Sequence, residues 1–134
     1  MGRMWMACAA MAAVLGVQGA EWFVDCTRPD DSGSGTDAVT AKRTIQAAVD
    51  AAGAGDTVTV LPGVYEEGGA TFTANSLVCS NRVYIAKNLT LRSRDGAAAT
   101  HIVGRKDPDS TSYGIGPAAI RCIAVKNDGP RVTI

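Results

Sequence analysis

The chain has 134 residues, of which 13 are Lys or Arg and 13 are Asp or Glu, so its formal net charge is zero. These charges are scattered along the sequence, and no basic block is present. A balanced and dispersed charge gives no electrostatic reason for binding to nucleic acid or to an anionic membrane, so we expect neither partner.

Residues 1–19 have the pattern of a signal peptide. Arg3 provides a short positive segment, and the apolar run that follows, residues 4–17, contains no charged residue. This run has the length of a signal core and is shorter than the roughly 20 residues of a membrane-spanning helix, so no transmembrane segment is predicted. We predict cleavage after Gly19, with cleavage after Ala20 as the alternative. A secreted or cell-surface protein is therefore expected.

Three cysteines follow the predicted signal peptide: Cys26, Cys79 and Cys122. In an exported protein, a disulfide between Cys79 and Cys122 is one interpretation. The other is that both are free thiols packed among apolar side chains. The cysteines lie too far apart in sequence for the close pairs that bind zinc, so they indicate no metal site.

The first part of the mature chain is predicted to form a strand, a loop and a helix. The strand covers residues 21–25, and a loop rich in Gly and Ser covers residues 29–37. The helix covers residues 39–52, with Thr40 as its N-cap and Gly53 as a left-handed residue after its end. Its apolar positions repeat with helical spacing and form one narrow face: Ile45, Ala48, Val49 and Ala52.

After residue 55 the pattern changes to short strands separated by turns. In residues 57–61 apolar and polar residues alternate, so Val58 and Val60 are predicted to face a core and Thr57 and Thr59 the outside. Similar runs occupy residues 82–85, 89–92, 101–103, 119–125 and 131–134, whereas residues 66–81 and 105–117 are predicted excursions.

This arrangement of strands predicts an all-β solenoid, in which each strand pairs with the next coil. An antiparallel sandwich is the alternative, and it would need two-residue hairpin turns between successive strands. Only Asp95-Gly96 and Asp128-Gly129 have the composition of such turns. The last predicted strand reaches Ile134 without a cap, so we expect the sequence to be a fragment of a longer protein.

Three segments resemble the first coil of exported, right-handed parallel β-helix proteins of the broad pectate-lyase-like group: Thr44–Ala52, Gly55-Asp56-Thr57-Val58 and Leu61-Pro62-Gly63-Val64-Tyr65. Later segments resemble following coils: Leu89–Ser93, His101–Gly104 and Ala119–Cys122. The resemblance covers residues 22–134. It implies a right-handed parallel β-helix over residues 20–134, apparently truncated, with an N-terminal capping helix. It does not specify a reaction, because these motifs cap and stack the coils.

In that family, a uronate lyase needs a basic residue and a Ca²⁺ ion that is held by carboxylates. Arg92, Arg94 and Asp95 are the candidate catalytic residues here, and the strand alternation places Arg92 on the outer surface. Because Asp95 is the only carboxylate nearby in sequence, we prefer to interpret the three as solvated exterior charges.

Glycoside hydrolysis requires two carboxylates that flank one bond. Glu66 and Glu67 are adjacent, so on a strand they would point to opposite faces. The Asn-x-Asp, Asp-Asp and Gly-His-Gly motifs of polygalacturonase-like hydrolases are absent. His101, the only histidine, is interpreted as structural.

Two functions are consistent with these patterns. The first is a secreted or cell-surface, adhesin-like protein that associates with extracellular polysaccharide, with no cofactor and no catalytic site in this stretch. The second is a polysaccharide lyase or glycoside hydrolase whose active site lies downstream of residue 134, with Ca²⁺ as cofactor if it is a lyase. Whether the protein is an enzyme stays open at this point.

Overall fold

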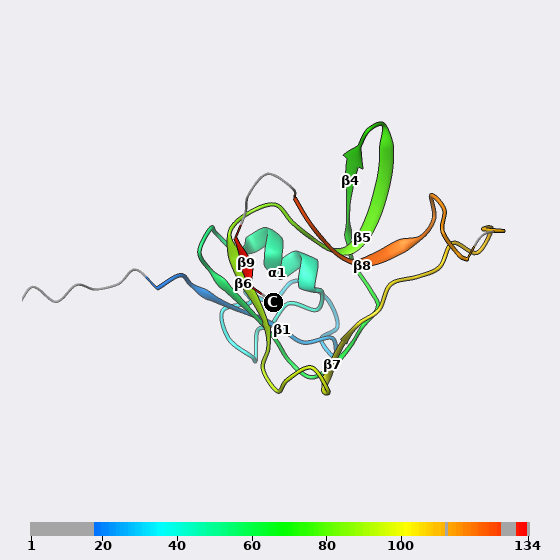
Figure 1. Ribbon diagram of the computed structural model, residues 1–134. Helices are drawn as coiled ribbons and strands as arrows, with labels where there is room; N and C mark the ends of the chain where they lie inside the picture. The colour runs from blue at the N-terminus through cyan, green and yellow to red at the C-terminus, as the bar shows by residue number, and fades with distance from the viewer. Residues whose placement is uncertain (1–17, 112, 127–130, 134) are drawn as a thin grey trace, which may run out of the picture.

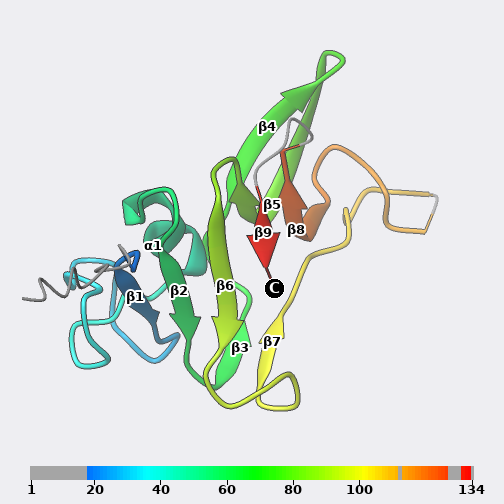
Figure 2. The same ribbon diagram turned by 60° about the vertical axis from the view of Figure 1, so that its left-hand side comes forward.

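The computed structural model describes residues 18–111, 113–126 and 131–133. Most of the predicted signal peptide and the Asp128-Gly129 turn lie outside the described residues. The elements are, in chain order, β1 (Glu21–Val24), α1 (Ile45–Ala51), β2 (Thr57–Val60), β3 (Gly63–Tyr65), β4 (Ala70–Ala74), β5 (Leu77–Ile85), β6 (Leu89–Ser93), β7 (Thr100–Ile102), β8 (Ile120–Val125) and β9 (Val132–Thr133). Figure 1 shows them coloured along the chain, and Figure 2 also labels β2 and β3. Within the described part of the chain, no helix is long and apolar enough to cross a membrane.

The strands form three separate sheets. The largest has the order β1-β2-β6-β9, and all of its neighbouring strands are parallel (Figure 2). A second sheet consists of β3 and β7, which are also parallel. The third has the order β4-β5-β8, in which β4 and β5 are antiparallel while β5 and β8 are parallel.

The predicted fold, an all-β solenoid in the form of a right-handed parallel β-helix with a capping helix, is therefore wrong. The described strands are divided among three sheets, one of them mixed, and one short helix packs against them. The main departure is in residues 66–81, which were predicted to be an excursion. Asn75 and Ser76 have φ values of 49° and 66°, so the chain reverses there and β4 pairs antiparallel with the first half of β5. A two-residue turn with both φ values positive is typical of a β-hairpin.

The helix α1 is shorter than predicted because a different threonine caps it. Thr44, not Thr40, is the N-cap, and its Oγ1 accepts a hydrogen bond of 3.3 Å from the Ala47 N–H. Thr40 lies in the preceding loop, where its carbonyl accepts a 2.7 Å hydrogen bond from the Gly35 N–H. The helix ends at Ala52, whose backbone is extended, and Gly53 does not have the predicted left-handed φ.

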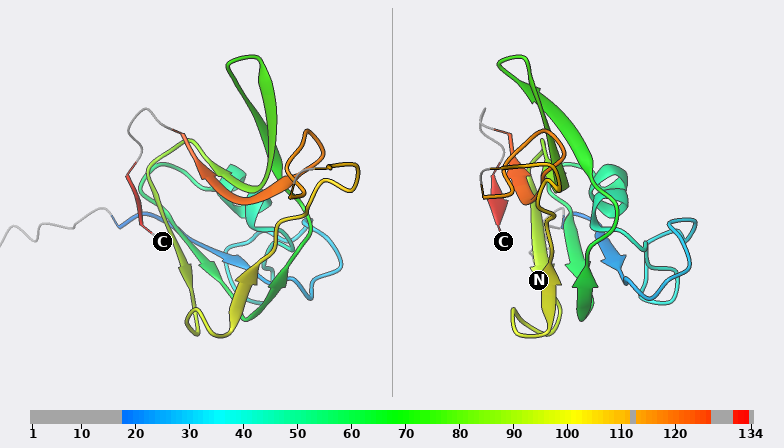
Figure 3. Two further views of the ribbon diagram at one scale, coloured as in Figure 1. Left: turned by 45° about the vertical axis from the view of Figure 1, so that its right-hand side comes forward. Right: turned by 90° about the vertical axis from the view of Figure 1, so that its right-hand side faces the viewer.

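The core lies between α1 and the three sheets. In Figure 3 the sheets surround a common interior, and the tip of the β4–β5 hairpin projects away from it. The predicted burial of Val58 and Val60 is confirmed, as is the predicted apolar face of the helix. Buried apolar residues from six elements and the end of α1 form one cluster: Val24, Ile45, Ala48, Val49, Ala52, Val58, Val60, Tyr65, Val83, Ile85, Leu89 and Leu91.

Gln46 joins the helix to the third sheet through a buried amide. Its Oε1 accepts a 2.7 Å hydrogen bond from the Tyr84 N–H, and its Nε2 donates to the Tyr84 carbonyl at 3.3 Å. The Gln46 side chain thus bonds to β5 as a neighbouring strand would. Both polar atoms of the buried amide are satisfied, which removes the cost of leaving them unpaired.

Candidate functional site

The outer surface of the four-stranded sheet carries two rows of side chains, all of them polar except Phe23. Strand alternation places these residues on the face opposite to the buried Val58 and Leu91. The register aligns Glu21, Thr57, Thr90 and Thr133 in one row, and Phe23, Thr59 and Arg92 in the next. We call these seven residues the outer face.

Three side chains of the outer face form a closed hydrogen-bonded group. Thr59 Oγ1 donates to Glu21 Oε1 at 2.6 Å, and Arg92 Nη2 donates to the same oxygen at 2.6 Å. Arg92 Nε donates to Thr59 Oγ1 at 3.0 Å. The hydrogen bond from Thr59, followed by the one from Arg92, lowers the pKa of the Glu21 carboxyl below its ordinary value.

This group explains the burial of Thr59. Its side chain was predicted to face outward, and it lies on the outer face, yet the residue is only 2 % exposed. The bonds above hold Arg92 and Glu21 against it. The Arg92 side chain, itself more than half exposed, is therefore held in a fixed orientation on the sheet.

The three predicted site residues do not form one cluster around a common partner. Arg92 lies on the outer face, as its alternation predicts, and is bonded to Glu21 and Thr59. Arg94 instead pairs with its neighbour Asp95, with 3.0 Å between Nε and Oδ2. Among the described residues, no group of three or more His, Cys, Asp or Glu side chains is arranged to hold a metal ion.

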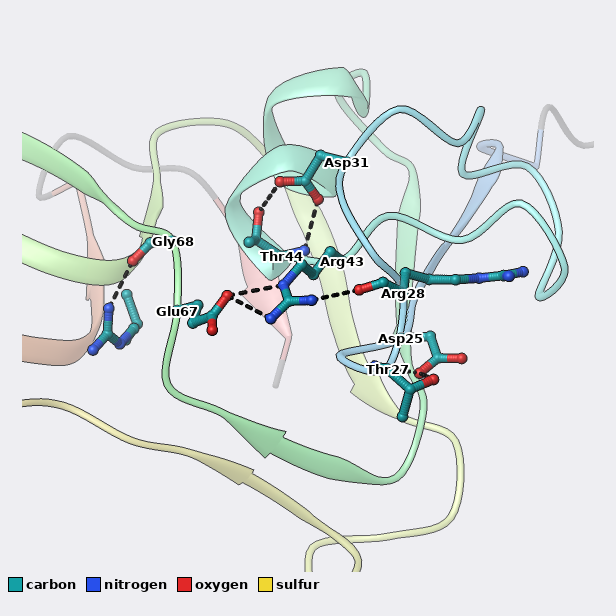
Figure 4. Close-up of polar contacts among 9 residues, drawn as sticks. Asp25, Thr27, Arg28, Asp31, Arg43, Thr44, Glu67 and Gly68 are labelled. Carbon is teal, nitrogen blue, oxygen red and sulfur yellow. Dashed lines mark hydrogen bonds and ion pairs between the residues drawn. The ribbon is translucent and has the colours of Figure 1, made fainter.

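A second polar centre, around Arg43, links the loop after β1 to the segment after β3 (Figure 4). Arg43 Nε and Nη2 donate to the same Glu67 oxygen at 2.8 and 2.7 Å. Its Nη1 donates to the carbonyl of Arg28 at 2.6 Å. Beside it, the Asp31 carboxylate accepts hydrogen bonds from Thr44 N and Thr44 Oγ1, at 2.7 and 2.9 Å.

A cleft of about 150 Å³ lies at this centre, lined by Cys26, Arg43, Val64, Tyr65, Glu66 and Glu67. No local sequence pattern predicts the cleft, because Arg43 and Glu67 are 24 residues apart and no motif connects them. Three of the Arg43 nitrogens already bond to protein oxygens. We therefore interpret this centre as a clamp that fixes the start of α1.

Tyr65 and Cys26 close the inner wall of the cleft. The Tyr65 hydroxyl lies 2.8 Å from the Leu61 carbonyl and 3.1 Å from the Val24 carbonyl, and burial raises its pKa. Gly63 has a φ of 153°, and a Cβ at this position would collide with Cys26 Sγ. A glycine is therefore required where β3 passes Cys26.

The structure does not bring Cys79 and Cys122 together. Both are free thiols, as is Cys26. The β5–β8 register pairs Asn81 with Arg121, which places Cys122 three positions further along the strands than Cys79. At about 3.3 Å per residue, this offset is about 10 Å, whereas the Cα atoms of a disulfide lie within about 7 Å. Of the two interpretations, the structure therefore has free thiols and not a Cys79–Cys122 bond.

No family model matches the chain, and no curated protein or solved structure matches it. The resemblance to pectate-lyase-like proteins therefore rests on the sequence motifs alone.

Proposed function

We propose that this protein is exported and associates with an extracellular polysaccharide, without catalysing its cleavage, through the outer face of the four-stranded sheet. The observation that carries the proposal is the outer face itself. It combines a row of threonines across parallel strands with an oriented, exposed arginine.

The threonine row presents hydroxyl groups at a regular spacing, which suits a ligand with a repeating structure. Thr57, Thr90 and Thr133 lie in register on three neighbouring strands. Neighbouring strands are about 4.8 Å apart, so the hydroxyls are presented at regular intervals. Each hydroxyl can both donate and accept a hydrogen bond, as the hydroxyls of a sugar polymer do.

Arg92 adds a preference for acidic sugars. Its guanidinium has five N–H donors, and the bonds to Glu21 and Thr59 use the Nε and one Nη2 donor. A planar guanidinium suits the planar carboxylate of a uronic acid, to which it can donate two parallel hydrogen bonds. Phe23, half-buried in the same row, adds apolar surface against which a sugar ring can lie.

The electrostatics of the group favour binding over catalysis. Arg92 donates to Glu21 at 2.6 Å, so its guanidinium is held in place as a hydrogen-bond donor. The lowered pKa of Glu21 keeps that carboxyl ionised at neutral pH, so it is a poor proton donor.

Binding of the exported protein to polygalacturonate, alginate and a neutral glucan tests this proposal. Arg92→Gln should weaken binding to the acidic polymers about tenfold, which corresponds to the loss of about 1.4 kcal/mol. Arg121→Gln, which removes an exposed charge from β8 in another sheet, is the matched control and should leave binding unchanged. The proposal fails if none of the polymers binds, if both variants behave alike, or if unsaturated sugar ends appear during incubation.

Export is tested separately. Leu15→Arg places a charge in the apolar run, which should block export and leave the chain inside the cell with residue 1 retained. Export that is unaffected by this substitution would contradict the signal-peptide assignment.

A further inference from the structure

Ala20, the predicted first residue of the mature chain, is hydrogen-bonded to the Asp56 carboxylate. The Ala20 N–H donates to Asp56 Oδ1 at 2.8 Å. The other oxygen, Oδ2, accepts hydrogen bonds from Trp22 Nε1 at 2.9 Å and from Gly53 N at 2.7 Å. Asp56 thus ties the residues before β1 to the turn between α1 and β2.

The Ala20 nitrogen has two chemical forms. In the uncleaved chain it is an amide N–H, and the bond to Asp56 is that of a neutral donor. In a chain cut after Gly19 the same nitrogen is an α-ammonium group with three donors and a positive charge. The α-amino group ordinarily titrates near pH 7.8, so it is charged under most conditions outside the cell.

We propose that Asp56 receives the α-ammonium group that signal cleavage after Gly19 creates on Ala20. Processing then converts a neutral hydrogen bond into an ion pair that fastens β1 to the α1–β2 turn. This inference rests on the proposed export and adds a structural consequence of cleavage that the export proposal does not contain.

The surroundings of Ala20 favour this cleavage site over the alternative. The Ala20 carbonyl accepts a 2.9 Å hydrogen bond from the Thr57 N–H, which extends the β1–β2 ladder by one residue. Cutting after Ala20 would remove this bond together with the bond to Asp56. Cutting after Gly19 keeps both.

Gly19 itself marks a close approach of the two segments. A Cβ at residue 19 would collide with the carbonyl of Gly55, so the uncleaved chain passes directly over the turn that carries Asp56. Loss of Gly19 removes the backbone from this place and opens the new ammonium group to water on that side, while Asp56 stays in hydrogen-bonding distance.

Among the described residues, Lys87 is a charge that acts on Asp56, and Glu21 follows Ala20 in the chain. Lys87 lowers the pKa of Asp56 as the last of several causes, after hydrogen bonds from Trp22, Gly53 and Ala20, and its Nζ donates to the Ala52 carbonyl at 2.6 Å. The Glu21 carboxylate already accepts a hydrogen bond from Thr59 and forms an ion pair with Arg92. Asp56 is therefore the carboxylate placed to pair with the new terminus.

The test uses the full chain, exported and purified from the medium. Its N-terminal residue is determined by intact mass and by sequencing. The pKa of the α-amino group is then measured by NMR in the wild type, in Asp56→Asn and in the control Asp109→Asn, which removes an exposed carboxylate elsewhere. We expect Ala20 at the terminus, an α-amino pKa raised from about 7.8 to about 9, and a return to about 7.8 in Asp56→Asn alone.

A chemical variant keeps the test independent of the folding of Asp56→Asn. Acetylation of the α-amino group of the wild type removes the charge and leaves Asp56 in place. The unmodified protein has a folded-state pKa above its unfolded value, so the added stability is complete below about pH 7.8 and disappears as the pH rises through about 9. Acetylated protein should lack this change in stability between pH 7 and pH 10.

The outcomes separate the two proposals. A chain that is found only inside the cells, with residue 1 retained, overturns export. A chain that begins at Glu21 leaves export standing and overturns the role of Asp56. A chain that begins at Ala20 with an ordinary α-amino pKa, or with a raised pKa that persists in Asp56→Asn, also overturns the role of Asp56.

Discussion

The strand β5 passes through two different regions: it begins in the hairpin with β4 and ends in the core. At its start, Leu77 and Val78 lie in the hairpin with β4 and are 69 % and 60 % exposed. At its end, Val83 and Ile85 are fully buried against the helix and the largest sheet. The tip of the hairpin therefore depends on its turn and its backbone pairing, whereas the core depends on side-chain burial.

The largest expected effect comes from removing apolar volume at the buried end of β5. Ile85→Ala should lower the free energy of unfolding by about 3 kcal/mol, because it leaves a cavity in a fully buried position. Leu77→Ala on the same strand should change it by less than about 0.5 kcal/mol. Denaturant unfolding of both variants checks this, and equal losses would show that the hairpin carries as much packing energy as the core.

The next effect tests the close approach of β3 to the loop after β1. Gly63→Ala places a Cβ against Cys26 Sγ at a φ of 153° and should cost about 2–3 kcal/mol. Gly96→Ala is the control, because its φ is also positive but no atom lies within 4 Å of the added Cβ, and it should cost about 1 kcal/mol. Adding Cys26→Ala should restore part of the loss at Gly63 only. No restoration would mean that the thiol is not the obstacle.

A smaller effect distinguishes the two candidate caps of the helix. Thr44→Ala removes the hydrogen bond that Oγ1 accepts from the Ala47 N–H, together with the one that it donates to Asp31 Oδ2, and should cost about 1 kcal/mol. Thr40→Ala removes a hydrogen bond with the Ser34 hydroxyl in an exposed loop and should cost a few tenths of a kcal/mol. Thermal unfolding of the pair measures the difference, and a larger loss at Thr40 would place the helix start where the sequence alone predicts it.

The smallest effect is the response to acid. The four-stranded sheet and the α1–β2 turn carry carboxyls with lowered pKa values, Glu21 and Asp56, whereas residues 70–81 of the hairpin contain no Asp or Glu. A lowered folded-state pKa contributes stability above the ordinary value near 4, and this contribution is lost as the pH falls through the folded-state value. Asp56→Asn should therefore be less stable than the wild type at pH 7 and equally stable at pH 2, by denaturant unfolding. If the difference in stability is the same at pH 2 as at pH 7, its cause is the loss of hydrogen bonds alone and not the charge of Asp56.

Local sequence patterns predict many of the buried residues, but they predict little of how the strands pair into sheets. The alternation at Val58 and Val60 and the helical spacing at Ile45 and Ala48 identify buried positions, because burial imposes those periods. The hairpin escaped prediction because Asn75-Ser76 lacks the glycine that usually marks such a turn. Once that hairpin forms, β5 belongs to a mixed sheet, so the predicted solenoid fails on a single turn that the pattern does not reveal.

The candidate site also depends on contacts between residues that are far apart in the sequence. The outward position of Arg92 follows from alternation, but its partner Glu21 lies 71 residues earlier in the chain. The correct cap, Thr44, depends on Asp31, 13 residues before it, and Arg43 depends on Glu67. Such contacts are set by strand register and loop paths, which no local spacing contains.

The proposed binding surface is the outer face of the four-stranded sheet, and not the projecting hairpin. NMR chemical-shift mapping of the exported protein during addition of polygalacturonate oligomers tests it most directly. We predict that the largest changes occur at the amides of Thr57, Thr90 and Arg92 and their strand neighbours, with the amides of residues 70–81 unchanged. Changes confined to the hairpin or to β8 would contradict the account.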